Sequence, residues 1–159
     1  MRGPAFGELE VISRQPPEKV SLRNTPLLFL HGAYAAAWCW DEHFLAYFAE
    51  RGYACYALSV SGHGGSPGRE HLDSFGLDHY VRDVAAVVEQ LPAPPVLVGH
   101  SMGGMVAQKY LESHEAAGLV LLASVPPQGL WAAALGLAFQ KPGVMSDLNS
   151  LLGGGRVAL

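Results

Sequence analysis

Residues 98–104 read Val-Gly-His-Ser-Met-Gly-Gly, and this stretch decides the fold. The short apolar run at 95–98 leads into it and has the character of a strand covered on both faces. Residues 103–114 follow, with apolar positions spaced for burial on one face of a helix. The glycines leave room for a sharp turn because they carry no Cβ. The stretch therefore predicts a tight strand-to-helix turn with Ser101 at its apex, on a strained backbone.

Apolar strands and helices alternate on both sides of this turn. The pattern predicts strands at 27–30, 53–58 and 119–123, and helices at 40–51 and 78–91. Asp41 is expected to cap the first of these helices, and the second is expected to bury Val81, Val84, Val88 and Leu91. The pattern indicates an α/β fold, a mostly parallel sheet with helices on both faces, and the four strands are expected to be parallel neighbours.

The N-terminal stretch has weaker signals. Residues 9–12 and 19–22 are expected to form short strands of a hairpin-like segment, with Pro16 and Pro17 between them. Ligands of parallel sheets bind at the carboxyl ends of the strands. The turns after Leu30, Leu58 and Val98 are therefore where functional residues are expected.

Two serines match the pattern Gly-x-Ser-x-Gly, namely Ser101 and Ser66. A nucleophilic serine of this kind needs a strand directly before it, a helix directly after it, and a backbone N–H from the next residue for the oxyanion. Ser66 lies in the glycine-rich loop 61–68 and is followed by Pro67, which has no N–H. Ser101 is followed by Met102, which has one. We expect Ser101 to be the nucleophile.

A second oxyanion donor is expected from the loop after an earlier central strand. His31-Gly32-Ala33 directly follows the strand at 27–30, and Gly32 allows the backbone to turn there. The N–H of Ala33 is therefore expected to donate to the oxyanion together with the N–H of Met102.

Three segments in order resemble the α/β-hydrolase family: residues 28–32 (Leu-Phe-Leu-His-Gly), 62–66 (Gly-His-Gly-Gly-Ser) and 98–104. The resemblance runs from about residue 25 to residue 124. Residues 31–33 with Ala-Trp-Cys-Trp at 37–40 are also similar to the branch that contains plant methylesterases and hydroxynitrile lyases. The resemblance implies a catalytic triad in the order serine, acid, histidine.

The triad acid and triad histidine are not identified. Downstream of Ser101 the carboxylates are Glu112, Glu115 and Asp147, and the histidine is His114. Thirteen helical residues, at about 1.5 Å each, would place His114 about 20 Å from Ser101. His31, His63 and His100 are interpreted mainly as structural or loop-shaping residues. His43, His71 and His79 fit solvated positions.

The resemblance to the α/β-hydrolase family also implies the domain organisation. Residues 1–124 are expected to form the N-terminal part of the hydrolase core, truncated before its last strands, and 125–159 the start of an incomplete cap or lid. The chain is interpreted as the N-terminal half of a hydrolase or as a truncated gene product. Four aromatic residues are candidates for an apolar substrate pocket or for core packing: Trp38, Trp40, Trp131 and Phe139.

Composition excludes several other functions. Ten basic and fourteen acidic residues give a net charge of −4. This balance lacks the excess of basic residues that is typical of proteins that bind nucleic acid or anionic lipid. No metal, nucleotide or flavin motif is present in the sequence, so no cofactor is implied. Cys39 and Cys55 are expected to be buried free thiols in a cytoplasmic protein. The uncharged stretch 116–139 is interrupted by Pro126 and Pro127, so stable membrane insertion is not expected.

The leading hypothesis is a serine hydrolase of the esterase or lipase type, acting on a small apolar ester-like substrate and catalytically incomplete in this chain. A hydroxynitrile lyase or a carbon–carbon bond hydrolase of the same fold is the first alternative. The alternative from another class is a non-catalytic remnant that binds a ligand or partner. The oligomeric state is left open.

Overall fold

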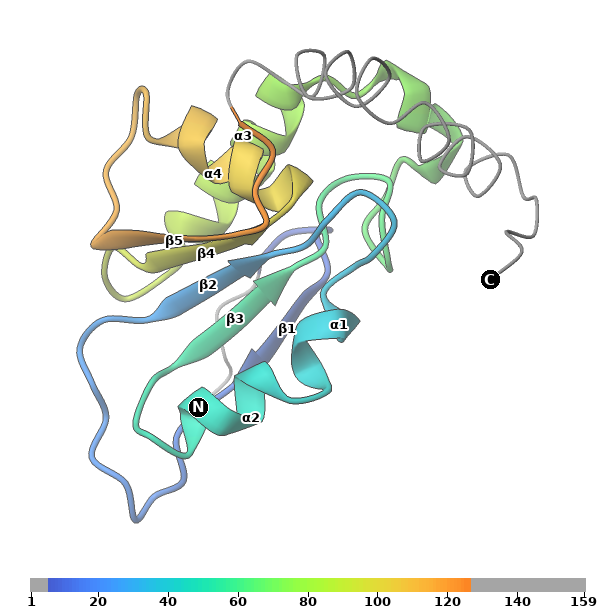
Figure 1. Ribbon diagram of the computed structural model, residues 1–159. Helices are drawn as coiled ribbons and strands as arrows, with labels where there is room; N and C mark the ends of the chain where they lie inside the picture. Colours follow the sequence, from blue (N-terminus) through green and yellow to red (C-terminus); the bar gives the residue numbers. More distant parts are fainter. Residues whose placement is uncertain (1–5, 127–159) are drawn as a thin grey trace, which may run out of the picture. The chain divides into compact units, whose positions relative to one another are not determined.

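The computed structural model describes residues 6–126, and in this range the strands form one five-stranded sheet of order β1-β3-β2-β4-β5 (Figure 1). The strands β2, β3, β4 and β5 are parallel neighbours, as predicted, and β1 is antiparallel to β3. The bounds are β1 Val11–Arg14, β2 Leu27–Leu30, β3 Cys55–Leu58, β4 Val96–His100 and β5 Gly118–Leu122.

Helices cover both faces of the sheet, as the alternating pattern predicted (Figure 1). On one face α1 (Trp38–Asp41) and α2 (Phe44–Ala49) contribute Trp40 and Leu45 to a core with Phe29. On the other face α3 (Leu77–Val88) and α4 (Met102–Tyr110) pack against Leu28 and Leu30. Successive residues of β2 thus enter opposite cores, which is why all four are buried and apolar.

The predicted N-terminal hairpin is wrong. β1 lies at Val11–Arg14 and pairs with β3, while residues 19–22 form turn and irregular structure. The N–H of Val20 donates to the carbonyl of Pro17 at 2.8 Å and closes a turn where the second strand was expected. Prolines 16 and 17 have no N–H to offer a strand partner, so β1 takes its partner from the distant β3 instead.

Three helix details also differ from expectation. The helix predicted at 40–51 is two short helices, because the backbone of His43 (φ −146°) departs from helical geometry between α1 and α2. Asp41 is not a cap: it ends α1, and its carboxylate accepts two hydrogen bonds from the Arg14 guanidinium of β1. In α3 the most buried positions are Tyr80, Asp83, Val84 and Val87.

The chain divides into two compact units, residues 1–125 and 126–159. The prediction that 125–159 begins a cap falls almost entirely outside the described residues. Among residues 6–126, no helix has both the length and the apolar character needed to cross a bilayer.

Candidate active site

Ser101 occupies the turn between β4 and α4, with backbone angles of φ 51° and ψ −116°. A residue with a side chain rarely adopts a positive φ, so the backbone of Ser101 is strained, as predicted. Its N–H donates to the carbonyl of Leu122 on β5 at 3.1 Å, and its carbonyl accepts the N–H of Gly104 at 3.1 Å. Neighbouring structure therefore holds Ser101 in this conformation at both of its peptide groups.

Glycine is required on both sides of Ser101 because strand and helix approach closely. A Cβ on Gly99 would lie 2.6 Å from the carbonyl oxygen of Gly103. A Cβ on Gly103 would lie 2.6 Å from the carbonyl oxygen of His31, and even nearer to that of Leu30. The start of α4 therefore presses against the carboxyl end of β2. This contact brings the turn at Ser101 to the loop that follows β2.

That loop, residues 31–36, lies directly beside Ser101. Leu30 is paired with Gly99, so β2 and β4 end at the same level of the sheet. A Cβ added to Gly32 would be 3.3 Å from the Cβ of Ser101 and 3.0 Å from Nδ1 of His100. Within the described range, no hydrogen bond occupies the N–H of Ala33 or that of Met102. Met102 directly follows Ser101 in the chain, and Ala33 directly follows Gly32, which lies beside Ser101.

His31 locks the start of this loop. Its side chain is buried, Nε2 accepts the N–H of Val60 at 3.2 Å, and Nδ1–H donates to the carbonyl of Gly32 at 2.8 Å. Burial, with a smaller contribution from the nearby His63, lowers the pKa of His31 to about 4, although the hydrogen bond to the Gly32 carbonyl opposes the shift. The imidazole is therefore neutral near pH 7. The same Gly32 carbonyl also accepts the N–H of Ala35 at 3.1 Å.

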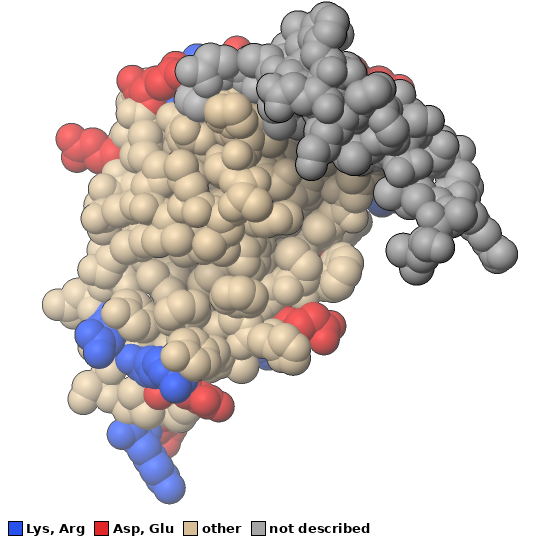
Figure 2. Space-filling model, viewed as in Figure 1, with Lys and Arg blue, Asp and Glu red and all other residues tan. Residues whose placement is uncertain are grey.

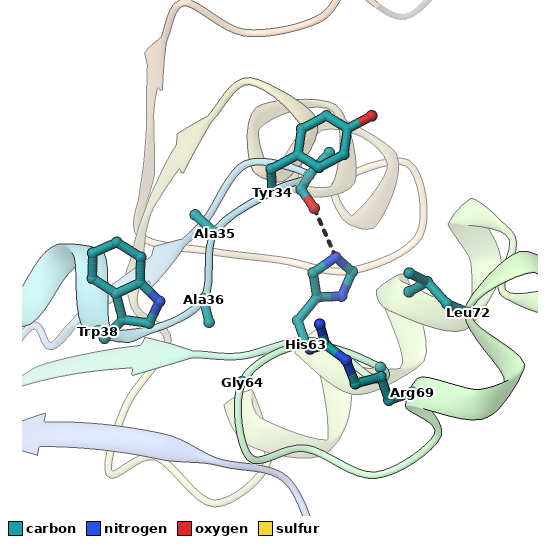
Figure 3. Close-up of a pocket in the computed structure, with 10 residues that line it drawn as sticks. Tyr34, Ala35, Ala36, Trp38, His63, Gly64, Arg69 and Leu72 are labelled. Carbon is teal, nitrogen blue, oxygen red and sulfur yellow. Dashed lines mark hydrogen bonds between the residues drawn. The ribbon is translucent and has the colours of Figure 1, made fainter. Parts of the chain in front are cut away.

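The loop 61–68, which follows β3, contacts the 31–36 loop through His63. His63 is 8% exposed, and its Nε2 lies 2.9 Å from the carbonyl oxygen of Ala33, the contact drawn dashed in Figure 3. Ser61 is held by Asp83 of α3, whose carboxylate accepts the Ser61 N–H at 2.7 Å and its hydroxyl at 3.0 Å.

Ser66 is a structural residue in the described site. Its hydroxyl donates to the carbonyl of Ser59 at 2.5 Å and accepts the N–H of Glu10 at 2.9 Å. It is 5% exposed. A hydroxyl occupied in this way, followed by a proline, is not placed to attack a substrate.

A pocket of about 300 Å³ opens beside the 31–36 loop (Figure 3). Trp38 stands on one side of it, and Leu72 and Arg69 on the other. Trp40 does not line it: this side chain is 4% exposed and packs against Phe29 with ring centroids 5.1 Å apart. Trp131 and Phe139, the other two aromatic candidates, lie outside the described residues.

All seven histidines fall within residues 6–126, and none forms a hydrogen bond with the Ser101 hydroxyl. His114 lies beyond α4 and stacks on Tyr110, with ring centroids 4.4 Å apart. Asp147 is outside the described range. Within that range no cluster of three or more His, Cys, Asp or Glu side chains is arranged to hold a metal ion.

The supports of the site were not anticipated from the sequence. Asp83 and Glu10 each hold a loop from far along the chain: the Ser59 hydroxyl donates to Glu10 Oε2 at 2.5 Å across 49 residues, and Asp83 reaches back 22 residues to Ser61. One signal was available for Asp83, because it lies three residues after Tyr80 on the buried face of α3. No local signal marks Glu10.

The visible face of the molecule shows little charge over its central part (Figure 2). At its lower end Lys and Arg side chains are mixed with Asp and Glu rather than gathered into a basic patch.

The fold and the turn at Ser101 agree with a known family. The family model described as the alpha/beta hydrolase family matches residues 27–156. The chain belongs to this family. The relatives of the chain therefore include hydrolases. They share with it the mostly parallel sheet with helices on both faces.

Individual relatives of this chain are named for several different activities. A non-heme haloperoxidase of Rhodococcus erythropolis is 39% identical over 106 residues, covering 64% of this chain and 38% of that protein. A bifunctional esterase/perhydrolase of Acinetobacter calcoaceticus is 36% identical over 110 residues, 66% of this chain and 39% of that protein.

A solved monoacylglycerol lipase of Paleococcus ferrophilus is similar in fold, with a TM-score of 0.61 and 23% identity, over 86% of this chain and 53% of that one. The chain thus spans well under two thirds of the length of each of these relatives.

Proposed function

We propose that this chain carries the nucleophile and the oxyanion donors of a serine hydrolase that acts on an ester or similar acyl bond. The observation that carries the proposal is the strained turn at Ser101, with Gly32 so near that a Cβ added to it would lie 3.3 Å from the Cβ of Ser101. A relative named as a bifunctional esterase/perhydrolase supports the reaction class.

In this proposal the Ser101 hydroxyl attacks the acyl carbon, and the carbonyl oxygen of the substrate takes up the negative charge. The N–H groups of Ala33 and Met102 donate to that oxygen. The Ala33 N–H shares a planar trans peptide with the Gly32 carbonyl, so the two point in opposite directions. Because His31 and Ala35 hold that carbonyl, they also aim the N–H.

The proton of Ser101 requires an acceptor that the described contacts do not supply. In the triad mechanism a histidine takes this proton and a carboxylate orients the histidine. Neither role is assigned to a residue of this chain. The complete reaction therefore needs a base in addition to the groups placed here.

The substrate proposed for this site is small and largely apolar. The pocket beside Ala33 has Trp38 on one side and Leu72 with Arg69 on the other, and the small side chains of Ala35 and Ala36 also line it. An acyl or alkyl group of a few carbons would bury apolar surface there.

The test is labelling by a fluorophosphonate probe, with imidazole added to the buffer as an external base. We expect the label on Ser101, located by mass spectrometry of peptides, and no label in Ser101→Ala. Ser66→Ala should keep the label, provided that circular dichroism shows it folded. A label that survives Ser101→Ala would show that another residue is the nucleophile.

A non-catalytic binding chain is the second candidate, and the absence of any histidine bonded to Ser101 in the described range favours it. The same labelling experiment distinguishes this candidate from a serine hydrolase. The folded chain would then show no more labelling than the urea-unfolded chain, with or without imidazole.

A further inference from the structure

His63 is a buried imidazole with both ring nitrogens facing backbone carbonyls. Nε2 lies 2.9 Å from the carbonyl oxygen of Ala33, and Nδ1 lies 3.1 Å from that of Ser61. A carbonyl oxygen only accepts hydrogen bonds, so each nitrogen must carry a proton to bond there. A neutral imidazole has one N–H, whereas the imidazolium has two. The doubly protonated ring alone satisfies both contacts.

Both acceptors belong to segments with further anchors. Ser61 is held to α3 by two hydrogen bonds from its N–H and hydroxyl to Asp83. Ala33 directly follows Gly32, whose carbonyl is held by His31 and Ala35. His63 therefore joins a loop fixed to α3 to the loop beside Ser101.

The groups around the ring come from every element that packs on it. His31 faces it with ring centroids 5.0 Å apart, and burial keeps His31 neutral near pH 7 by lowering its pKa to about 4. Tyr80 of α3 presents its ring edge at 6.0 Å. Other charged or titratable groups near the 61–68 loop are Glu10, beside Gly64 and Gly65; Asp83 and His79, at Ser61; and Tyr34 and Arg69, in the shared pocket.

We propose that His63 is a positioning residue of the 31–36 loop, hereafter the oxyanion loop, and acts as a protonated bridge between the carbonyls of Ser61 and Ala33. This role rests on the proposed function of the Ala33 N–H. With the Gly32 carbonyl held by His31 and the Ala33 carbonyl held by His63, the peptides on both sides of Ala33 are fixed. Rotation about the backbone bonds of Ala33 is thereby restrained, and its N–H keeps one direction.

Loss of one proton from His63 breaks one of the two bonds. The unprotonated nitrogen would present a lone pair to a carbonyl oxygen about 3 Å away, which is repulsive. The loop at Ala33 then separates from the loop at Ser61 or rotates its carbonyl. The order of the oxyanion loop therefore falls as His63 loses its proton.

The test is nuclear magnetic resonance of the whole 159-residue chain labelled with ¹⁵N and ¹³C. We expect both ring nitrogens of His63 to carry protons at the acid end of its titration. The amide and carbonyl signals of Ala33 should then move with the same midpoint when the ring loses a proton. A His63 with a single ring proton throughout the folded range, or Ala33 signals that do not follow it, would overturn the proposal.

Three variants separate positioning from a general effect on folding. In His63→Gln the side chain still donates but does not titrate, so the Ala33 signals should become independent of pH over that range. In His63→Ala, the Ala33 chemical shifts should lie at all pH values near those that the wild type shows when His63 is deprotonated. The matched control is His71→Gln, an exposed histidine of the neighbouring turn, which should leave the Ala33 titration unchanged. A titration of Ala33 that persists in His63→Gln contradicts the proposal.

A second measurement tests the effect on Ser101. The ratio of fluorophosphonate labelling rates, wild type over His63→Ala, should be about tenfold or more at the acid end and approach one above the His63 midpoint. A ratio that is the same at all pH values overturns the proposal. If Ser101 does not label at all, the proposed function fails while the magnetic resonance experiment still decides the role of His63.

Discussion

Ser101 has backbone angles that glycine adopts more readily than any residue with a Cβ. Such a residue carries about 1–3 kcal/mol of strain. Replacing it with glycine relieves that strain, and the entropic cost of glycine, about 0.5–1 kcal/mol, offsets part of the gain. We expect Ser101→Gly to have a free energy of unfolding about 1 kcal/mol above that of Ser101→Ala, measured in urea.

Alanine is the matched control because both variants lack the hydroxyl and differ only in the Cβ. Equal stability of the two, or a more stable Ser101→Ala, would show that the turn is not strained.

His31 should make stability depend on pH. Its pKa is 6.5 when unfolded and about 4 when folded, because burial disfavours the charged ring. The unfolded chain therefore binds the proton more readily, and the free energy of unfolding falls as pH drops from 6.5 toward 4. The loss contributed by His31 is about 3 kcal/mol at the lower end and absent near pH 7.

The measurement compares urea unfolding of the wild type and His31→Gln across this pH range. The difference between the two curves removes the contribution of carboxylates common to both. A parallel pair of curves would contradict the prediction. If His31→Gln does not fold, the titration of His31 in the wild type, followed by magnetic resonance, gives the same answer directly.

At the scale of the element, α3 stabilises the site through one buried carboxylate. Asp83 accepts two hydrogen bonds from Ser61 and is 8% exposed. In Asp83→Asn one acceptor oxygen is replaced by an amide NH₂, which cannot accept. We expect a loss of about 1–3 kcal/mol in the free energy of unfolding. Faster hydrogen exchange at the Ser61 amide should accompany it.

Glu89→Gln is the control on the same helix. Glu89 is exposed at the C-terminal end of α3, so its change should stay within about 0.5 kcal/mol. Equal effects of the two substitutions would mean that the carboxylate of Asp83 does not anchor the loop.

At the scale of the whole molecule, the chain should turn over esters slowly. No histidine in the described range bonds to Ser101, and a neutral hydroxyl without a base is a weak nucleophile near pH 7. Oxyanion donors and binding by themselves sustain only about 10³–10⁴-fold acceleration over water. The measurement is hydrolysis of p-nitrophenyl butyrate by the purified monomer. A kcat of about 1 s⁻¹ or more that disappears in Ser101→Ala would refute this.

Much of this molecule was predictable because its signals are local. The strand at 27–30 is a four-residue apolar run, and the turn at Ser101 follows from a strand, two glycines and a helix adjacent in sequence. The exclusion of Ser66 followed from its position in the glycine-rich loop and from Pro67, since a residue without an N–H cannot donate to an oxyanion. The order of such segments was enough to predict the parallel sheet.

The sequence by itself thus determined the class of fold, the parallel core strands and the position of Ser101. The tertiary structure alone decided that β1 pairs with β3, that Trp40 belongs to the core, and that His63 reaches the carbonyl of Ala33 across 30 residues. The physical reason is range. Periodicity and turn chemistry act between neighbours, whereas a buried polar group takes whichever partner the folded chain brings within about 3 Å.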